Sequence, residues 1–195
     1  MRRPPNYVYS ADDLAECSLL ATRQLAVVVP LTQGKVAFID PEDVQRVTSG
    51  YTWAALRREN DVWYAVANIR GSRSAGRRGP RQIYMHTLVS GLSKPDHRDR
   101  NGLNNTKINL RAAEDWQNSG NTGKRKGTSS RFKGVTYVAR TGRWAAQMHH
   151  RGHKIHLGYF TEEEEAARGY DRAAAAHFGE FAATNVMLGL LPAEG

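Results

Sequence analysis

Cysteine is almost absent from this sequence, because Cys17 is the only one in 195 residues. A single thiol excludes an intramolecular disulfide and a zinc site built on paired thiolates, and it is typical of a reducing, cytoplasmic location. Long apolar runs are absent too, since the apolar residues 25–31 include Pro30 and fall far short of the roughly 18 residues that a transmembrane helix needs. Prolines follow Arg2 and Arg3, so we expect neither a secretory signal nor a membrane partner.

Acidic residues are missing from two stretches of the chain. Residues 70–82 contain five arginines and no Asp or Glu, and residues 121–160 contain nine Lys or Arg and no acid. The whole chain carries a net charge of +9 and has a sequence pI near 9.9. This distribution favours a polyanionic partner, while a basic protein that binds no nucleic acid is the simpler alternative.

The N-terminal half contains short runs rich in β-branched and aromatic residues. Clusters of Gly, Pro, Asn and Asp separate these runs, which is typical of strands joined by turns. The sequence predicts strands at residues 27–31, 35–40, 51–56 and 62–69, and short helices at residues 11–22 and 41–49.

The strand pattern restarts after a stretch, residues 122–130, that has the composition of a linker. The runs FKGVTYVA, RWAAQMHH and HKIHLGYF predict three strands within residues 132–160. The text TEEEEAARGYDRAAAAHFG then predicts a helix, which Thr161 can cap and Gly179 can end.

Side chains alternate along the middle strand of this second group. Trp144, Ala146 and Met148 share an apolar face, and the other face carries Arg143, Ala145, Gln147 and His149. We expect the apolar face to pack on one stripe of the helix and the polar face to remain exposed. The helix stripe consists of Ala166, Tyr170, Ala173, Ala174, His177 and Phe178.

One segment holds a distinctive set of polar residues: MHTLVSGLSKPDHRDRNGLNNTKINLRAAEDWQNSGN. Asp96 and His97 are adjacent in it, an Asn-Leu-Arg triplet begins at Asn109, and Asn118 follows. A carboxylate and an amide are ligands for a hard divalent metal, while a neighbouring imidazole takes a proton from water. The segment predicts a strand, a turn-rich loop, a returning strand and a helix, an order that would gather these side chains.

Other polar residues of the segment have simpler interpretations. Asp99, Asn104 and Asn105 lie in the turn-rich loop and are expected to be turn residues rather than chemical groups. His86 fits a strand position, where we expect it to pack or to support its neighbours.

Three segments of the chain resemble the HNH endonucleases of the ββα-metal fold, in particular the homing-type members of phages and introns. These segments are YMHTLVSG, PDHRDRNGLNN and INLRAAEDWQN. The resemblance covers residues 27–121. It implies that His97 is the general base that activates water, and that Asn109 orients the catalytic loop. It also implies that Asp96 and Asn118 ligate one divalent ion, Mg²⁺ or Mn²⁺.

The C-terminal text, with GV…GRWAA, LGYF, EEAARGYDRAA and a final Asn, resembles the APETALA/ethylene-response-factor DNA-binding domain over residues 131–187. In that family a three-stranded sheet lies in the major groove and reads bases with strand side chains. The matching positions are Lys133, Thr136, Val138, Arg140, Arg143, Gln147, His149, Lys154 and His156. Several of them lack the arginine that reads guanine, so the base specificity of the family is not carried over.

The sequence therefore predicts a DNA endonuclease of the HNH homing type. We expect it to act on double-stranded DNA with a metal ion and no small-molecule cofactor, as a monomer in the cytoplasm, that of the host cell if a phage encodes it. The main alternative is a transcriptional regulator that binds DNA through a non-catalytic HNH scaffold. An RNA-binding or RNA-processing protein is a third interpretation.

The predicted fold class is α+β, with a β-rich N-terminal part and a ββα-metal unit, followed by a three-stranded antiparallel sheet packed on one helix. The expected divisions are an N-terminal extension (1–26), the HNH endonuclease domain (27–121), a basic linker (122–130), the APETALA/ethylene-response-factor-like domain (131–187) and a tail (188–195).

Overall fold

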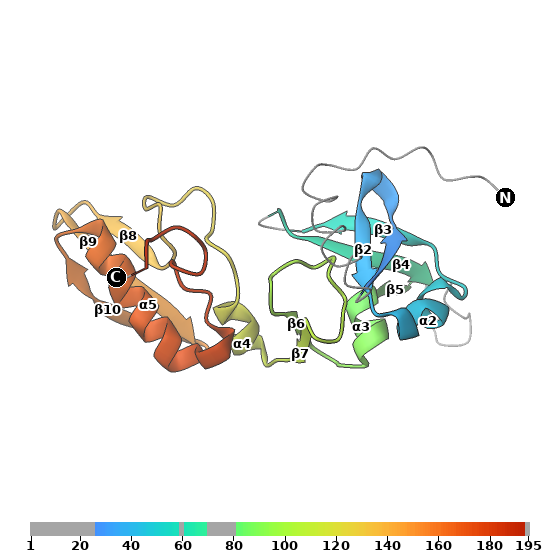
Figure 1. Ribbon diagram of the computed structural model, residues 1–195. Helices are drawn as coiled ribbons and strands as arrows, with labels where there is room; N and C mark the ends of the chain where they lie inside the picture. Colours follow the sequence, from blue (N-terminus) through green and yellow to red (C-terminus); the bar gives the residue numbers. More distant parts are fainter. Residues whose placement is uncertain (1–25, 59–60, 70–80, 194–195) are drawn as a thin grey trace. The chain divides into compact units, whose positions relative to one another are not determined.

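The computed structural model describes residues 26–58, 61–69 and 81–193, which divide into two compact units between Ala112 and Ala113 (Figure 1). The helix predicted at residues 11–22 lies outside the described residues, as does most of the arginine-rich stretch 70–82.

The N-terminal unit is built from three small antiparallel sheets. Strands β1 and β2 form a hairpin, β3, β4 and β5 form a sheet in that order, and β6 pairs with β7. The predicted strands and the predicted helix at residues 41–49 are confirmed. The elements are β1 (Val27–Pro30), η1 (Thr32–Gly34), β2 (Val36–Ile39), η2 (Pro41–Asp43), α2 (Val44–Thr48), β3 (Trp53–Arg57), β4 (Trp63–Ile69), β5 (Arg81–Tyr84), α3 (Met85–Ser90), β6 (Pro95–His97) and β7 (Leu110–Ala112).

His86 lies in helix α3, so its predicted strand position is wrong. Met85 and Val89, four residues apart, are both buried, which is the spacing of one helix face. The run is short and rich in apolar and β-branched residues, a composition that is also typical of a strand. The helix ends at Gly91, whose backbone is left-handed. Met85 joins a core that also contains Ile39 and Val47, so α3 is held against the sheets by buried apolar contacts.

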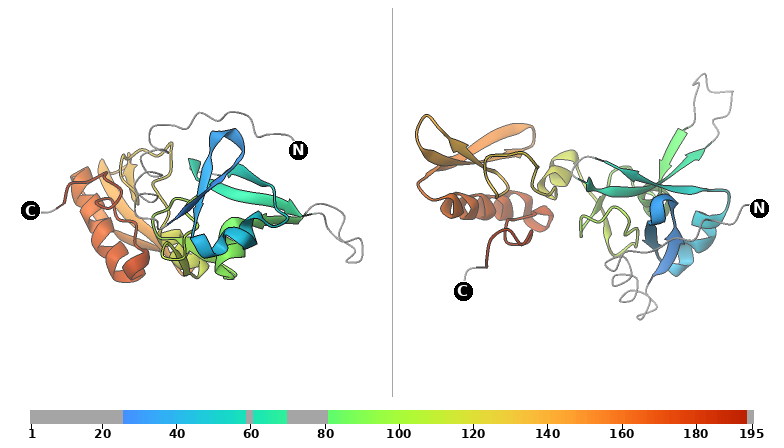
Figure 2. Two further views of the ribbon diagram at one scale, coloured as in Figure 1. Left: turned by 45° about the vertical axis from the view of Figure 1, so that its right-hand side comes forward. Right: turned by 90° about the horizontal axis from the view of Figure 1, so that it is seen from above.

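The C-terminal unit is a three-stranded antiparallel sheet with one long helix. The strand order is β10–β9–β8, and Figure 2 shows the helix α5 along one face of the sheet. The three strands and the helix occur where the sequence predicts them. The elements are α4 (Asp115–Gly120), β8 (Val135–Val138), β9 (Arg143–His150), β10 (His153–Phe160), α5 (Glu163–Phe178) and η5 (Gly179–Phe181).

Apolar side chains join the helix to the sheet. Tyr170, Ala174 and Phe178 are buried with Met148 of β9, and the apolar stripe agrees with its prediction except at one residue. His177 is exposed, because the neighbouring Phe178 occupies the buried position at this end of the helix.

The ends of α5 differ in how well the sequence predicts them. The predicted cap at Thr161 is wrong, since Glu162 is the N-cap residue and makes no side-chain capping bond. The first turn instead carries three glutamates, whose charges suit the positive end of the helix dipole. The predicted end at Gly179 is confirmed.

Helix α4 packs within the C-terminal unit. Its N-terminus has a capping box, in which the Glu114 side chain and the Gln117 side chain each bond the other residue's backbone N–H. The Trp116 ring lies 4.7 Å from the His150 ring and 6.2 Å from the Phe178 ring, measured between centroids. The helix that follows β7 in the chain is therefore anchored to the sheet of the C-terminal unit.

Candidate functional site

The β6–β7 hairpin carries a buried ion pair. Asp96 and Arg111 lie opposite each other in the register of the two strands, and each is 8% exposed. Arg111 donates from both Nε and Nη2 to the Asp96 Oδ2, each at 2.8 Å. Arg111 had no role in the sequence prediction. The Asn-Leu-Arg triplet contains it, but only the strand register shows that it faces Asp96.

His97 is buried in a group of aromatic rings. Its ring centroid lies 5.0 Å from that of His86 and 5.8 Å from that of Tyr64, and His86 stacks on Tyr84 at 5.1 Å. Burial lowers the pKa of His97 below its ordinary value, although Asn105, Asp99 and Asp96 oppose this shift. Burial, with a smaller contribution from His97, lowers the pKa of His86 to about 3. Both imidazoles are therefore neutral at pH 7.

Asn105 determines which nitrogen of His97 carries the proton. The Asn105 side chain is fully buried, and its Nδ2 donates to the Leu103 carbonyl at 3.0 Å and to the Met85 Sδ at 3.4 Å. With both donors directed there, its Oδ1 faces the His97 Nε2 at 3.5 Å. An amide oxygen only accepts, so this contact favours the tautomer of His97 that carries its hydrogen on Nε2.

Asn105, which the sequence predicts as a turn residue without a chemical role, is fully buried in the loop. Its backbone N–H donates to the Phe38 carbonyl at 2.7 Å, which attaches the loop to β2. Two adjacent asparagines in a loop do not reveal which one is buried, because that depends on a strand more than sixty positions earlier in the chain.

Asn109 holds the loop between β6 and β7. Its Nδ2 donates to the Asp99 Oδ1 at 2.9 Å and to the Asn104 carbonyl at 2.8 Å, and its Oδ1 accepts the Asp99 N–H at 3.0 Å. These bonds agree with the turn roles predicted for Asp99 and Asn104. A Cβ added at Gly102 would lie 2.7 Å from a Tyr64 ring carbon, so the loop backbone sits directly on the ring beside His97.

Asn118 lies in α4 of the C-terminal unit. Its Oδ1 is buried and has no hydrogen-bond partner among the residues that the structure describes. A buried acceptor without a protein partner is costly, so we expect a bound water or ion to satisfy it.

The polar face of the C-terminal sheet gathers most of the residues predicted to contact DNA. Opposite positions in the strand register share a face, and α5 covers the other one. His149 lies opposite Lys154, and Gln147 lies opposite His156. The residues on the polar face are Thr136, Arg143, Gln147, His149, Lys154 and His156, all exposed except the half-buried Gln147. Val138, opposite Arg143, is on the same face.

Two predicted residues lie elsewhere. Arg140 is exposed in the turn between β8 and β9. Lys133 precedes β8 and is 8% exposed, with its Nζ donating to the Gly120 carbonyl at 2.8 Å and the Ala183 carbonyl at 3.1 Å.

The sequence prediction omitted Tyr159. This residue lies opposite Ala145 on the polar face, is 51% exposed and has its ring 4.5 Å from that of His156. Simple alternation from Lys154 puts it on the apolar face, but a register shift between His156 and Gly158 reverses it.

The residues that the structure describes contain no group of three or more His, Cys, Asp or Glu side chains placed to hold a metal ion. None of their helices is long and apolar enough to cross a membrane.

Known proteins of two kinds are similar to this chain, HNH endonucleases and plant AP2/ERF proteins. No family model matches the chain. An uncharacterized HNH endonuclease of Acanthamoeba polyphaga mimivirus is 42% identical over 158 residues, which are 78% of this chain and 76% of the relative.

Plant proteins match a shorter part. An AP2/ERF and B3 domain-containing protein of Oryza sativa is 51% identical over 57 residues, which are 29% of this chain and 15% of the relative. An AP2/ERF and B3 domain-containing transcription repressor of Arabidopsis thaliana is 44% identical over 71 residues, 36% of this chain and 19% of the relative. The chain thus spans less than a fifth of these plant proteins. Because the viral relative matches over most of both lengths, the chain belongs to the HNH endonuclease family.

Proposed function

We propose that this protein is a metal-dependent DNA endonuclease of the homing type, which hydrolyses phosphodiester bonds of duplex DNA. One observation carries the proposal: His97 is a buried, neutral imidazole beside the Asp96 carboxylate, and its Nε2 faces the Oδ1 of the buried Asn105. The similarity to the viral HNH endonuclease supports the same reaction class.

His97 is the proposed general base. In this role the neutral imidazole takes a proton from the attacking water. Asn105 is a positioning residue in this scheme, since it fixes the tautomer without touching the reacting atoms. Asn109 has a similar task, because it holds the loop that rests on Tyr64.

Asp96 is the proposed ligand of Mg²⁺ or Mn²⁺ in the N-terminal unit. Its donor atoms are carboxylate oxygens, which suit hard divalent cations. Arg111 holds the Asp96 carboxylate in a fixed orientation. A bound ion would stabilise the charge that develops on the phosphorane and on the leaving 3′-oxygen, which yields 5′-phosphate and 3′-hydroxyl ends.

Target binding is assigned to residues 131–187, as in the APETALA/ethylene-response-factor domains. The exposed polar face of β8–β9–β10 presents Arg143 and Lys154 together with histidine, threonine and glutamine side chains. Cationic side chains bind phosphates, and the polar ones are able to bond base edges in the major groove. The similarity to plant AP2/ERF proteins supports DNA as the partner.

A regulator that binds DNA without cutting it is the second candidate. The Asp96–Arg111 ion pair favours it, because a carboxylate that is already paired needs no metal to be satisfied. The similarity to a plant transcription repressor points in the same direction.

Incubation with supercoiled plasmid separates the two candidates. The nuclease converts the plasmid to nicked or linear DNA in Mg²⁺ and leaves it intact in EDTA. A protein that shifts the plasmid on a gel but leaves it supercoiled in both Mg²⁺ and Mn²⁺ is the regulator.

A further inference from the structure

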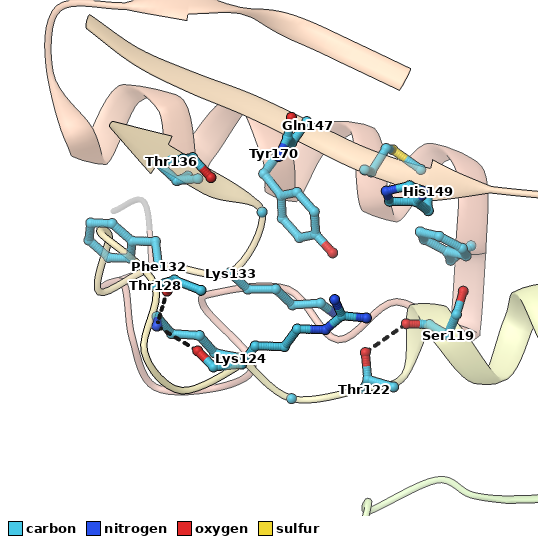
Figure 3. Close-up of a pocket in the computed structure, with 16 residues that line it drawn as sticks. Ser119, Thr122, Lys124, Thr128, Phe132, Lys133, Thr136, Gln147, His149 and Tyr170 are labelled. Carbon is cyan, nitrogen blue, oxygen red and sulfur yellow. Dashed lines mark hydrogen bonds between the residues drawn. The ribbon is translucent and has the colours of Figure 1, made fainter. Parts of the chain in front are cut away.

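The C-terminal unit contains a cavity of about 320 Å³ beside the polar sheet face. One wall consists of Thr136, Gln147 and His149, which are residues of that face. The other wall is the stretch that the sequence predicts as a linker, including Lys124 and Arg125. Figure 3 shows Lys124 and Lys133 on one side of the space and the strand residues on the other.

The charge of the cavity is entirely positive. Its lining residues include two lysines, one arginine and one histidine but no Asp or Glu. Hydroxyl groups of Thr122 and Thr128 lie among them. Both hydroxyls donate to backbone carbonyls, of Ser119 and Ser130, so the cations are the groups that favour an anion here.

The linker wall is folded rather than extended. The Lys124 Nζ donates to the Arg125 carbonyl at 2.9 Å and to the Thr128 Oγ1 at 2.7 Å (Figure 3). Ser129 accepts the Tyr137 N–H of β8 through its Oγ at 3.0 Å. These bonds hold the loop against the sheet, so its cations are placed before any ligand arrives.

Lys133 closes the back of the cavity. Its bonds to two backbone carbonyls tie the start of the loop at Gly120 to the chain after α5. Its Nζ also lies 5.7 Å from the centroid of the Tyr170 ring, which Figure 3 shows pointing its hydroxyl into the space. Gly134 is required here, because a Cβ would lie 2.7 Å from the Tyr170 Cγ and the backbone φ is +77°.

Arg125 differs from the two lysines. It lines the cavity and is exposed, and its guanidinium makes no hydrogen bond or ion pair within the part of the chain that the structure describes. Its five donors are therefore available to a ligand.

We propose that this cavity binds a sugar–phosphate unit of the DNA backbone, so that the linker is part of the DNA-binding surface. Arg125 bonds the phosphate oxygens, and the space between it and the polar sheet face accommodates the sugar. Continuity with the polar sheet face makes the backbone of the same duplex the occupant. This inference rests on the proposed DNA binding by the sheet, but not on cleavage.

The test measures binding of a fluorescent duplex of arbitrary sequence in EDTA at several salt concentrations. Loss of one phosphate contact lowers the slope of log affinity against log salt concentration by about 0.9. Between about 50 and about 200 mM salt, the affinity of the wild type should therefore fall by a factor about 3.5 times larger than the affinity of Arg125→Gln. Arg125→Lys keeps most of the slope. Lys126→Gln is the matched control, because Lys126 is exposed on the same loop but does not line the cavity.

Equal effects of Arg125→Gln and Lys126→Gln would mean a diffuse electrostatic field and would overturn the proposal. A second measurement addresses a small ligand: deoxyribose 5-phosphate is titrated without DNA while the amide signals of residues 122–124 are followed. Saturable binding at low micromolar concentration would assign the cavity to a free phosphorylated molecule and reject the DNA backbone. No saturation supports the proposal.

The outcomes also separate this inference from the proposed function. A wild-type protein that fails to bind duplex at low salt contradicts the DNA-binding part of the function, and the cavity proposal fails with it. Normal binding with an unchanged slope in Arg125→Gln removes the cavity proposal alone. A reduced slope in a protein that never cuts plasmid removes only the nuclease.

Discussion

In the N-terminal unit the polar residues of interest are buried, whereas in the C-terminal unit most of them are exposed. Asp96, His97 and Asn109 are each 8% exposed or less, and their bonds are made to other protein groups. Arg143 and Lys154 project from a sheet face into solvent. Burial shifts pKa values and fixes orientation, which suits catalysis, while exposure keeps cations available to a large polyanion.

This contrast predicts that the two activities are separable by mutation, most strongly at His97. We expect His97→Ala to reduce plasmid cleavage in Mg²⁺ by about 10²- to 10⁴-fold, the usual contribution of a general base. DNA affinity in EDTA should stay within about twofold of the wild type, since a general base contacts the attacking water and adds little to binding of the duplex. The exposed His153 supplies the control, His153→Ala. Full activity of His97→Ala would remove the assigned base.

Stability should also respond unequally to loss of an arginine. Arg111→Met leaves the buried Asp96 carboxylate without its partner, which costs about 3–5 kcal/mol. Amide hydrogen exchange should show faster opening of peptides from the N-terminal unit and unchanged peptides from the sheet β8–β10. The exposed Arg143→Met should change stability by less than about 0.5 kcal/mol. Equal protection of both variants from amide hydrogen exchange would show that the ion pair does not stabilise the N-terminal unit.

Asn105 tests whether orientation matters apart from the base itself. Asn105→Leu should lower cleavage by about 10- to 100-fold, the usual cost of losing a group that orients a catalytic side chain. The ¹⁵N chemical shifts of His97 report its tautomer without metal or substrate. We expect the Nε2–H form in the wild type and a mixture in the variant. The same tautomer in both proteins would exclude Asn105 as the positioning residue.

The buried histidines make the stability of the N-terminal unit depend on pH. The folded pKa of His86 is about 3 against an ordinary 6.5, so the unfolded chain binds an extra proton between these values. The free energy of unfolding is therefore highest above pH 6.5 and falls on acidification by up to about 1.4 kcal/mol per pH unit. Urea unfolding of His86→Gln should show a smaller pH slope, while His153→Gln keeps it. An unchanged slope in His86→Gln would contradict the burial effect.

The smallest expected effect is on the exposed side of the comparison. Arg143→Gln should weaken duplex binding by about 1 kcal/mol, or roughly fivefold, because it removes one contact among many. Cleavage of saturating DNA should be unchanged. Arg172→Gln on the exposed part of α5 is the matched control for net charge. If both variants lose affinity equally, the sheet face has no special role.

Local patterns predicted the elements well in the C-terminal unit. Alternation along β9 separates Trp144 and Met148 from Gln147 and His149, and the strand register keeps that separation. Errors arose where a neighbour in space decided the outcome. A bulge turned Tyr159 to the polar face, and two distant carbonyls drew Lys133 into the interior.

The N-terminal site divides in the same way. The sequence alone reveals Asp96, His97 and Asn109 as candidate site residues, because that prediction depends on residue type and spacing. The roles of Asn105 and Arg111 are not, because each depends on a partner in another strand or loop.

The sequence by itself determined the residue types that carry the chemistry, the basic character of the second half and the order of strands and helices, since these follow from composition and periodicity. Only the tertiary structure decided that Asn105 faces the Nε2 of His97, that Arg111 faces Asp96, and that the predicted linker forms one wall of a cationic cavity. The physical reason is that hydrogen bonds and burial join residues that are far apart in the chain, and no local pattern records those partners.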